Sequence, residues 1–174
     1  ISASPTLMVG TSITIDPTKD MGLKHSEVFY MTPTISNSSG GLTITTRKSG
    51  DAALIFDVTA LKRGTYTISV KMNFKHNNVS YVGYTATYTI NVVDVTQIKM
   101  PSSLNLQVGE NYTFSPQILE TGATSELTWT SSNTSVALVD NTGKLRCLRV
   151  GASNITCTAY NGVSATCKLT VIPV

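Results

Sequence analysis

The feature that most constrains this chain is an internal repeat of strand-like sequence. Three short segments of the first half recur in the same order in the second half, at offsets that fall from 99 to 87 to 79 residues. The paired segments are Met8–Pro17 with Gln107–Pro116, Leu61–Ile68 with Leu148–Ile155, and Ala86–Val92 with Ala165–Val171. In a chain of 174 residues this repeat predicts two modules, residues 1–94 and 95–174.

Short runs of alternating apolar and polar residues predict β-strands throughout both modules, and no segment shows a helical period. Gly10, Gly64, Gly109 and Gly151 separate these runs, and Asn161–Gly162 predicts a two-residue hairpin turn. An all-β sandwich or barrel follows from many short strands with such turns. The predicted strands are Ser12–Ile15, Leu42–Thr45, Ala53–Val58, Thr65–Phe74, Tyr81–Val92, Leu104–Val108, Asn111–Ser115, Leu127–Thr130, Val136–Val139, Lys144–Leu148, Asn154–Tyr160 and Ser164–Ile172.

The shrinking offset places extra residues in two parts of the first module. One insertion lies around Lys75–Gly83, where we expect it to lengthen the last hairpin and make its tip project. The segment Met31–Lys48, with SNSSGG at Ser36–Gly41, predicts a wide loop that interrupts a sheet. Insertions of this kind are normally loops, so the copies are expected to share a scaffold and differ in loops.

Composition excludes several classes of protein. Apolar residues make up 41% of the chain and charged residues 13%, which favours half-buried strands over amphipathic helices or disorder. A net charge of +3 is too small to indicate a nucleic-acid partner. The apolar runs are far shorter than the ~20 residues that a membrane-spanning helix needs, so this segment is expected to have no membrane span. Any signal peptide or lipid anchor was removed or lies outside the sequence.

The three cysteines lie ten residues apart and each shares a strand face with apolar neighbours. Cys147, Cys157 and Cys167 are therefore expected to be buried thiols, although Cys157 and Cys167 are also placed to form a disulfide across a hairpin. No CxxC pair occurs, and the only two histidines are remote in sequence, so no metal site is expected.

No residue pattern in the chain indicates catalysis. Sequences of the GxSxG or HExxH type and paired carboxylates are missing, and Asp16, Asp20, Asp51 and Asp57 are too dispersed for a calcium loop. We therefore expect no catalytic residue, no cofactor and no enzyme activity in this segment.

Five residues around the enlarged hairpin form the candidate contact surface: Tyr81, Tyr84, Tyr88, Lys75 and His76. Exposed tyrosines are common anchors in protein and glycan contacts. The alternative is that the tyrosines alternate between strand faces and half of them are buried. Basic residues on other loops of this module, such as Arg47 and Lys62, face either an anionic surface polymer or only solvent. Trp129, the single tryptophan, is expected in the core of the second module.

Residues 97–171 resemble the bacterial immunoglobulin-like domain, group 2. The motif that carries the resemblance is WTSSN at Trp129–Asn133, VALVD at Val136–Asp140 and GKL at Gly143–Leu145, followed by Gly151 and Ile155. Over residues 4–94 only the Val-Gly, Leu-Lys-Arg-Gly and final-strand pieces match, so the first module resembles a divergent relative.

The resemblance implies two tandem immunoglobulin-like β-sandwiches at a bacterial outer surface or in the periplasm. It implies a spacer or adhesion module within a longer multidomain chain, with a cell-surface glycan or a host or matrix protein as partner, and no shared ligand pocket. Two alternatives are a glycan-binding accessory module of a surface lipoprotein or polysaccharide-handling system, which requires aromatic residues exposed together, and a phage virion decoration domain.

Overall fold

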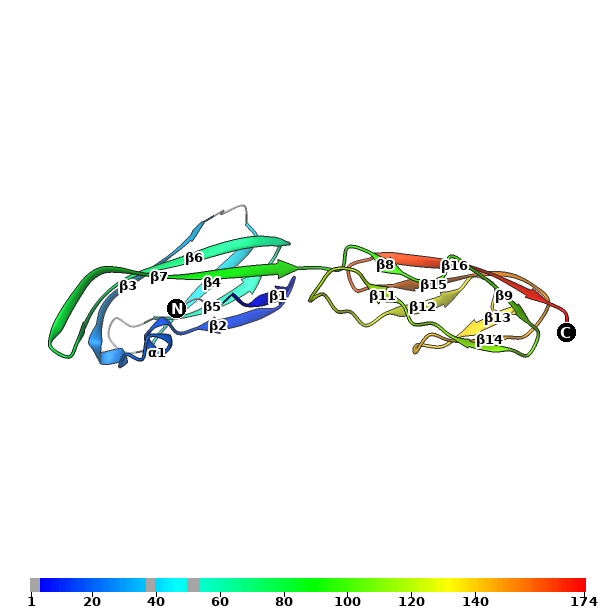
Figure 1. Cartoon of the computed structure of the whole chain (residues 1–174), viewed down its shortest axis with the longest axis horizontal. Helices are drawn as coiled ribbons and strands as arrows, with labels where there is room; N and C mark the ends of the chain where they lie inside the picture. The colour runs from blue at the N-terminus through cyan, green and yellow to red at the C-terminus, as the bar shows by residue number, and fades with distance from the viewer. Residues whose placement is uncertain (1–3, 37–39, 50–53) are drawn as a thin grey trace. The chain divides into compact units, whose positions relative to one another are not determined.

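The computed structural model describes residues 4–36, 40–49 and 54–174, and the chain forms two compact units, Ile1–Asp94 (unit 1) and Val95–Val174 (unit 2) (Figure 1). Both units consist almost wholly of β-strands. Unit 1 contains β1 Thr6–Met8, β2 Ser12–Ile15, α1 Pro17–Asp20, the 3-10 helix η1 His25–Glu27, β3 Val28–Ser36, β4 Leu42–Lys48, β5 Leu54–Ala60, β6 Gly64–His76 and β7 Val79–Val93. Unit 2 contains β8 Ile98–Lys99, β9 Ser103–Gln107, β10 Asn111–Thr113, β11 Gln117–Ile118, β12 Thr128–Ser131, β13 Ala137–Val139, β14 Lys144–Cys147, β15 Gly151–Thr158 and β16 Ser164–Ile172.

Unit 1 is a sandwich of two sheets, in the orders β1-β7-β6-β3 and β2-β5-β4. Along each strand, every second side chain points into the space between the two sheets. Phe56 and Val58 of β5 meet Ile68 and Val70 of β6 and Ile90 of β7 in one fully buried cluster. The core of unit 1 therefore contains side chains from both of its sheets.

Unit 2 repeats this plan with the sheets β12-β15-β16-β9 and β10-β14-β13 and a short pair, β11-β8. Leu145 on β14 packs with Ile155 on β15 and Leu169 on β16. Trp129 on β12 stacks on Phe114, with ring centroids 5.2 Å apart, and also contacts a second cluster around Cys157. The predicted all-β fold of two immunoglobulin-like sandwiches is confirmed, and Trp129 packs against the core.

The internal repeat is visible as matching backbone hydrogen bonds. In each unit an early strand pairs in parallel with the last strand, β1 with β7 and β9 with β16. The matching bonds, donor first, are Val9–Val93 with Val108–Ile172, Gly10–Ala60 with Gly109–Cys147, Thr11–Met8 with Glu110–Gln107, Ala60–Thr11 with Cys147–Glu110, and Leu61–Gly41 with Leu148–Val136. The repeat therefore reflects one scaffold, folded twice.

Both scaffolds begin with the same glycine turn. Gly10 and Gly109 have φ values of +86° and +89°. L-residues with a Cβ rarely adopt this conformation, so glycine is the residue that lets the chain cross from the first strand into the opposite sheet.

The prediction of a wide loop over Met31–Lys48 is wrong. Strand β3 runs from Val28 to Ser36 and pairs with β6, and β4 runs from Leu42 to Lys48 and pairs with β5. Pro33 lies inside β3, where it is tolerated because β3 is the edge strand of its sheet. Residues 37–39 of the predicted loop, and Ala53 of the predicted strand Ala53–Val58, lie outside the described residues.

The expectation of no helix is also wrong, although both helices are short. Pro17 opens α1, where a missing N–H costs nothing, and the Asp16 carboxylate caps it by accepting from the Lys19 N–H at 3.1 Å. Helix η1 begins at His25, after a short turn over residues 21–24. Four residues of helix are too few for any period to appear in the sequence.

The hairpin between β15 and β16 has a three-residue loop instead of the predicted two-residue turn. Ala159 donates to the Val163 carbonyl and accepts from the Gly162 N–H, which leaves Tyr160–Gly162 as the loop. Gly162 has a φ of +88°, the left-handed residue that such a loop requires.

The cysteines are buried and free, as the face pattern predicted. Cys157 lies opposite Ala165, and Cys167 lies opposite Ile155, so the two are not cross-strand partners. Burial raises the pKa of the Cys147, Cys157 and Cys167 thiols. The disulfide alternative is therefore not realised.

Candidate functional site

The enlarged hairpin of unit 1 is a two-stranded ribbon formed by β6 and β7, and its extra residues are paired strand. Pairing runs from Gly64 opposite Val92 to His76 opposite Val79. Asn77 and Asn78, with φ values of +49° and +65°, form the two-residue turn. The expectation that these extra residues form a loop is wrong, because they extend the sheet.

A bulge near the end of the ribbon brings two predicted contact residues onto one face. Phe74 lies opposite Tyr81 and Met72 lies opposite Tyr84, so Val82 and Gly83 together face the single residue Asn73. The Gly83 N–H donates to Asn73 Oδ1 at 2.7 Å. Without the bulge, an odd spacing would place Tyr81 and Tyr84 on opposite faces.

The three rings on this face contact one another. Phe74 is buried and stacks on Tyr81 with centroids 4.7 Å apart, and it meets Tyr84 edge-on at 5.7 Å. Tyr81 and Tyr84 are 40% and 41% exposed. Two tyrosine rings are thus held by a buried third ring and presented to solvent.

Tyr88 does not belong to this surface, which corrects the prediction. Its side chain is 2% exposed and lies in the core, opposite Ile68. The Tyr88 hydroxyl donates to Asp20 Oδ2 at 3.2 Å, and burial together with the Asp20 charge raises the Tyr88 pKa. The period of two carries Tyr88 inward with Ala86 and Ile90.

His76 and Lys75 lie at the end of the ribbon, on its two faces. His76 Nδ1 lies 3.0 Å from Glu27 Oε1, which ties η1 to the ribbon. The Lys24 backbone N–H and His76 both lower the pKa of Glu27. Lys75 lines a shallow hollow with Phe29 and the Asn77–Asn78 turn. His76 therefore connects the ribbon to η1, while the Lys75 side chain is exposed to solvent.

Sequence reasoning missed four exposed apolar residues at the same end of unit 1. They are Phe29 and Tyr30 on β3 and Val79 and Val82 on β7. Tyr30 lies opposite Asn73, on the face away from Tyr81. We call these four residues, together with Tyr81 and Tyr84, the ribbon patch. Recognising β3 as a strand would have placed Phe29 and Tyr30 beside the ribbon.

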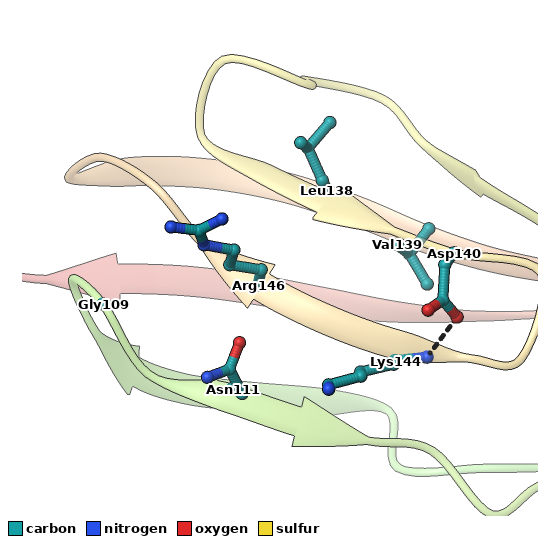
Figure 2. A pocket seen from close by; sticks show the side chains of 7 residues that line it. All are labelled: Gly109, Asn111, Leu138, Val139, Asp140, Lys144 and Arg146. Atoms are coloured by element: carbon teal, nitrogen blue, oxygen red, sulfur yellow. Dashed lines mark hydrogen bonds between the residues drawn. The ribbon is translucent and has the colours of Figure 1, made fainter.

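Unit 2 carries a second candidate surface on the outer face of its β10-β14-β13 sheet (Figure 2). A shallow hollow there is lined by Gly109, Asn111, Leu138, Val139, Asp140, Lys144 and Arg146. The strand register puts Asn111, Arg146 and Leu138 in one row across the three strands. The sequence offered no signal for this grouping, because its members come from separate strands.

Asp140, at one end of this hollow, is already occupied by its own turn. Its Oδ1 accepts from the Thr142 hydroxyl at 2.6 Å, the Thr142 N–H at 2.8 Å and the Lys144 N–H at 3.0 Å. These bonds, the Thr142 hydroxyl first, lower the Asp140 pKa. Asp140 therefore shapes the hairpin, and the Lys144 charge contributes further to its lowered pKa.

Residues of the motif that carries the family resemblance, and residues that contact it, have structural roles in unit 2. Gly143, at φ +80°, lies so close to Trp129 that a Cβ there would come within 2.8 Å of the indole Cζ2. The buried Ser153 hydroxyl lies 2.9 Å from Ser131 Oγ and accepts from the Asn133 N–H at 3.0 Å. Gly143 and Ser153 thus serve the fold of unit 2.

The described residues offer few other kinds of site. Among residues 4–36, 40–49 and 54–174, no three His, Cys, Asp or Glu side chains are grouped to hold a metal ion. Neither helix of this described part has the length or apolar character to cross a membrane.

Sequence comparison shows which known modules unit 2 is similar to. The family described as bacterial Ig-like domain (group 2) matches residues 94–170, which confirms the resemblance. An uncharacterised protein of Clostridium acetobutylicum is 34% identical over 102 residues, covering 53% of this chain and 26% of the relative. The chain thus spans about a quarter of the length of that curated relative. The family match does not include residues 4–93.

Solved structures with similar folds include domains 4 and 5 of the surface layer protein SbsC, at 17% identity, a TM-score of 0.46, and coverage of 82% of this chain and 70% of that one. Domains EC1–4 of a protocadherin, PcdhgB3, match at 9% identity and a TM-score of 0.45, covering 99% and 49%. Invasin, a bacterial integrin-binding protein, matches at 12% identity and a TM-score of 0.35, covering 97% and 37%.

Proposed function

We propose that this chain is a non-enzymatic, extracytoplasmic segment of a bacterial surface protein, and that unit 1 contacts a partner through the end of its β6–β7 ribbon. The observation that carries the proposal is the ribbon patch, six exposed aromatic and apolar side chains on one part of unit 1. Apolar residues gathered in this way commonly mark interaction sites, whereas single exposed ones need no explanation.

The ribbon patch is suited to contact because part of it is held in place before binding. Tyr81 and Tyr84 rest on buried Phe74, and the bulge at Gly83 fixes their register. Tyrosines bring a large amphipathic area into a contact at low cost in conformational entropy. Rigid presentation lowers the entropy cost of binding further.

A protein groove is the partner that this arrangement favours. Tyr81, Tyr84 and Val79 share one face of the ribbon, while Tyr30 and Phe29 lie on the face of Lys75. A ribbon with apolar side chains on both faces buries them all only when the partner surrounds it. We therefore assign the contact with this partner to unit 1.

A glycan is the second candidate partner, because Tyr81 and Tyr84 are exposed together on one face. Two neighbouring rings of this kind are able to stack on successive sugar units. In that case the face that carries Tyr30 takes no part in binding. The two candidates therefore differ in which face of the ribbon matters.

The test is a binding screen of the purified chain against host matrix proteins and glycans, followed by single substitutions. Tyr81→Ser and Tyr30→Ser change opposite faces, and Tyr160→Ser, an exposed tyrosine of unit 2, is the matched control. Binding weakened by both ribbon substitutions supports a protein groove, and binding weakened by Tyr81→Ser alone supports a glycan. Binding that survives both ribbon substitutions would place the contact outside the ribbon patch, and no binding by the chain at all would leave unit 1 without the proposed contact role.

A further inference from the structure

The outer face of the smaller sheet, β2-β5-β4 in unit 1 and β10-β14-β13 in unit 2, carries different charges in the two units. In unit 1, Asp57 on the central strand β5 accepts from Arg47 Nε at 2.6 Å, from Arg47 Nη2 at 3.1 Å and from the Thr14 hydroxyl at 2.7 Å. The next row is closed by Ser12 and Thr59, whose hydroxyl oxygens lie 2.8 Å apart. Every polar group in these two rows of β2 and β5 therefore has a partner within unit 1.

In unit 2 the repeat puts two cations on the matching strand. Lys144 and Arg146 of β14 lie 87 residues after Asp57 and Thr59, the offset of this part of the repeat. Among the described residues no acidic side chain forms an ion pair with Lys144 or Arg146, and Asp140 is engaged by its own turn. This face thus carries two cations and one carboxylate, Asp140, which interacts with Lys144 through its charge but forms no salt bridge of the kind that unit 1 has.

The side chains of Lys144 and Arg146 lie on the same face of β14 and line the same hollow. They are alternate residues of β14, so their side chains emerge on the same side about 7 Å apart. Figure 2 shows Arg146, Lys144 and Asn111 around the same hollow, with Leu138 across from Arg146. Leu138 is 46% exposed. The hollow therefore offers two positive charges beside one carboxylate, Asp140, together with an amide and an apolar side chain.

We propose that this face of unit 2 binds an acidic polysaccharide, a sugar polymer that carries carboxylate or sulfate groups. Arg146 and Lys144 take the acidic groups, with the guanidinium able to bind one in a bidentate manner. The Asn111 amide meets sugar hydroxyls and Leu138 meets the apolar face of a sugar ring. The site is separate from the ribbon patch and does not depend on the function proposed for it.

Two features of the hollow favour a polysaccharide over an acidic peptide or a nucleic acid. The hollow lies on the face of the sheet, whereas peptides that add to a sheet use the backbone groups of its edge. Its lining contains no aromatic ring on which a base stacks. An open face that recognises its ligand by side chains alone suits a chain of acidic sugars.

The experiment measures binding of the intact chain to four immobilised polymers. Polygalacturonate carries carboxylates and dextran sulfate carries sulfates, poly-glutamate is an acidic polypeptide, and dextran is neutral. The test variant is Lys144→Gln with Arg146→Gln. The control is Lys99→Gln with Lys168→Gln, which removes the same charge from strands β8 and β16 of unit 2.

We expect the chain to bind one or both acidic polysaccharides and to bind dextran no better than a blank surface. The test variant should weaken binding at least about tenfold because two charge-assisted contacts are lost. The control should stay within about twofold of the unchanged chain. Which polymer binds more tightly identifies the acidic group.

A second variant separates loss of the site from loss of fold. Leu138→Glu places a carboxylate beside Arg146 on an exposed strand position, which imitates the closed face of unit 1. It should abolish binding while leaving the melting temperature of unit 2 nearly unchanged. The proposal is overturned if no acidic polysaccharide binds, if the control weakens binding as much as the test variant, or if poly-glutamate binds as tightly as the polysaccharides.

Discussion

Units 1 and 2 share a scaffold and differ most in their last hairpin. In unit 2, β15 and β16 pair from Gly151 to Thr158, and a three-residue loop closes the turn. In unit 1 the equivalent pairing continues to His76 and ends with aromatic residues. The difference teaches that this scaffold gains exposed aromatic side chains by extending paired strands, which hold the added residues in a fixed register.

A second difference concerns the outer face of the smaller sheet. Unit 1 has the Arg47–Asp57 ion pair on this face, and in unit 2 neither Lys144 nor Arg146 forms a salt bridge among the described residues. Neither change alters the hydrogen bonds that define the scaffold. Surface chemistry has therefore diverged while the backbone has been kept.

The largest effect is expected where an aromatic ring supports the core. Trp129→Ala should destabilise unit 2 by about 3 kcal/mol, because it removes the ring that packs on Phe114 and both apolar clusters. Tyr81→Ala on the ribbon should cost less than about 1 kcal/mol. Calorimetry with hydrogen exchange assigns each loss to its unit. A wild-type stability of Trp129→Ala would contradict the role of Trp129 in the core.

The next effect tests why Gly143 belongs to the motif of unit 2. Gly143→Ala should lower the free energy of unfolding by about 2 kcal/mol. The alanine would be strained at a φ of +80°, and its Cβ would lie 2.8 Å from Trp129 Cζ2. Urea unfolding measures the loss, and a shift in Trp129 fluorescence should accompany it. A cost no greater than that of Gly162→Ala, which has a similar φ and open space, would show that the indole contact is unimportant.

A smaller effect tests whether the two scaffolds are equivalent. Gly10→Ala and Gly109→Ala both meet open space and have nearly the same φ, so each should cost about 1 kcal/mol through backbone strain alone. The free energy of unfolding of each variant provides the comparison. Costs that differ by more than about 1 kcal/mol would break the equivalence of the first turn.

The smallest expected effect is on how the stability of unit 1 depends on acidic pH. The Arg47 guanidinium, with the Thr14 hydroxyl, holds the pKa of Asp57 below its usual 3.8. A lowered folded pKa means that the pairing stabilises unit 1 fully above the unfolded pKa and that this contribution is lost as the pH falls through the folded pKa. Asp57→Asn should therefore flatten the acid dependence of unit 1 below a pH of about 4.

Asp140→Asn provides the counterpart in unit 2, because its turn also lowers the Asp140 pKa. Melting temperatures followed from neutral to acidic pH measure both variants. Each substitution should change the acid limb of its own unit only. A change of equal size in both units for either variant would mean that the acid dependence has another source.

Much of the fold follows from local sequence. The sequence predicts the glycine turns, the alternation of core residues such as Ile68 and Leu145, and the buried cysteines. Each of these features depends on a single residue type or a single period along the chain. Strand β3 was missed because Pro33 and its Ser- and Gly-rich continuation give a loop signal that only an edge position overrides. Helix α1 was missed because a single turn has no period.

Much less of the candidate sites follows from the sequence. Tyr81 and Tyr84 were predicted as contact residues, but the bulge that puts them on one face depends on how β6 and β7 pair. Tyr88 looked equivalent to them and is buried, because it lies where the second sheet covers the ribbon. The hollow around Arg146 collects residues from three strands, and no local pattern links them.

The sequence by itself therefore determined the all-β class, the repeat and the resemblance of unit 2 to the bacterial immunoglobulin-like domain, group 2. These properties depend on spacing along the chain, which the sequence contains directly. The tertiary structure alone decided which aromatic rings reach solvent and which cations lie unpaired. Those properties depend on strand register and on which sheet covers which face, and both are set by long-range pairing.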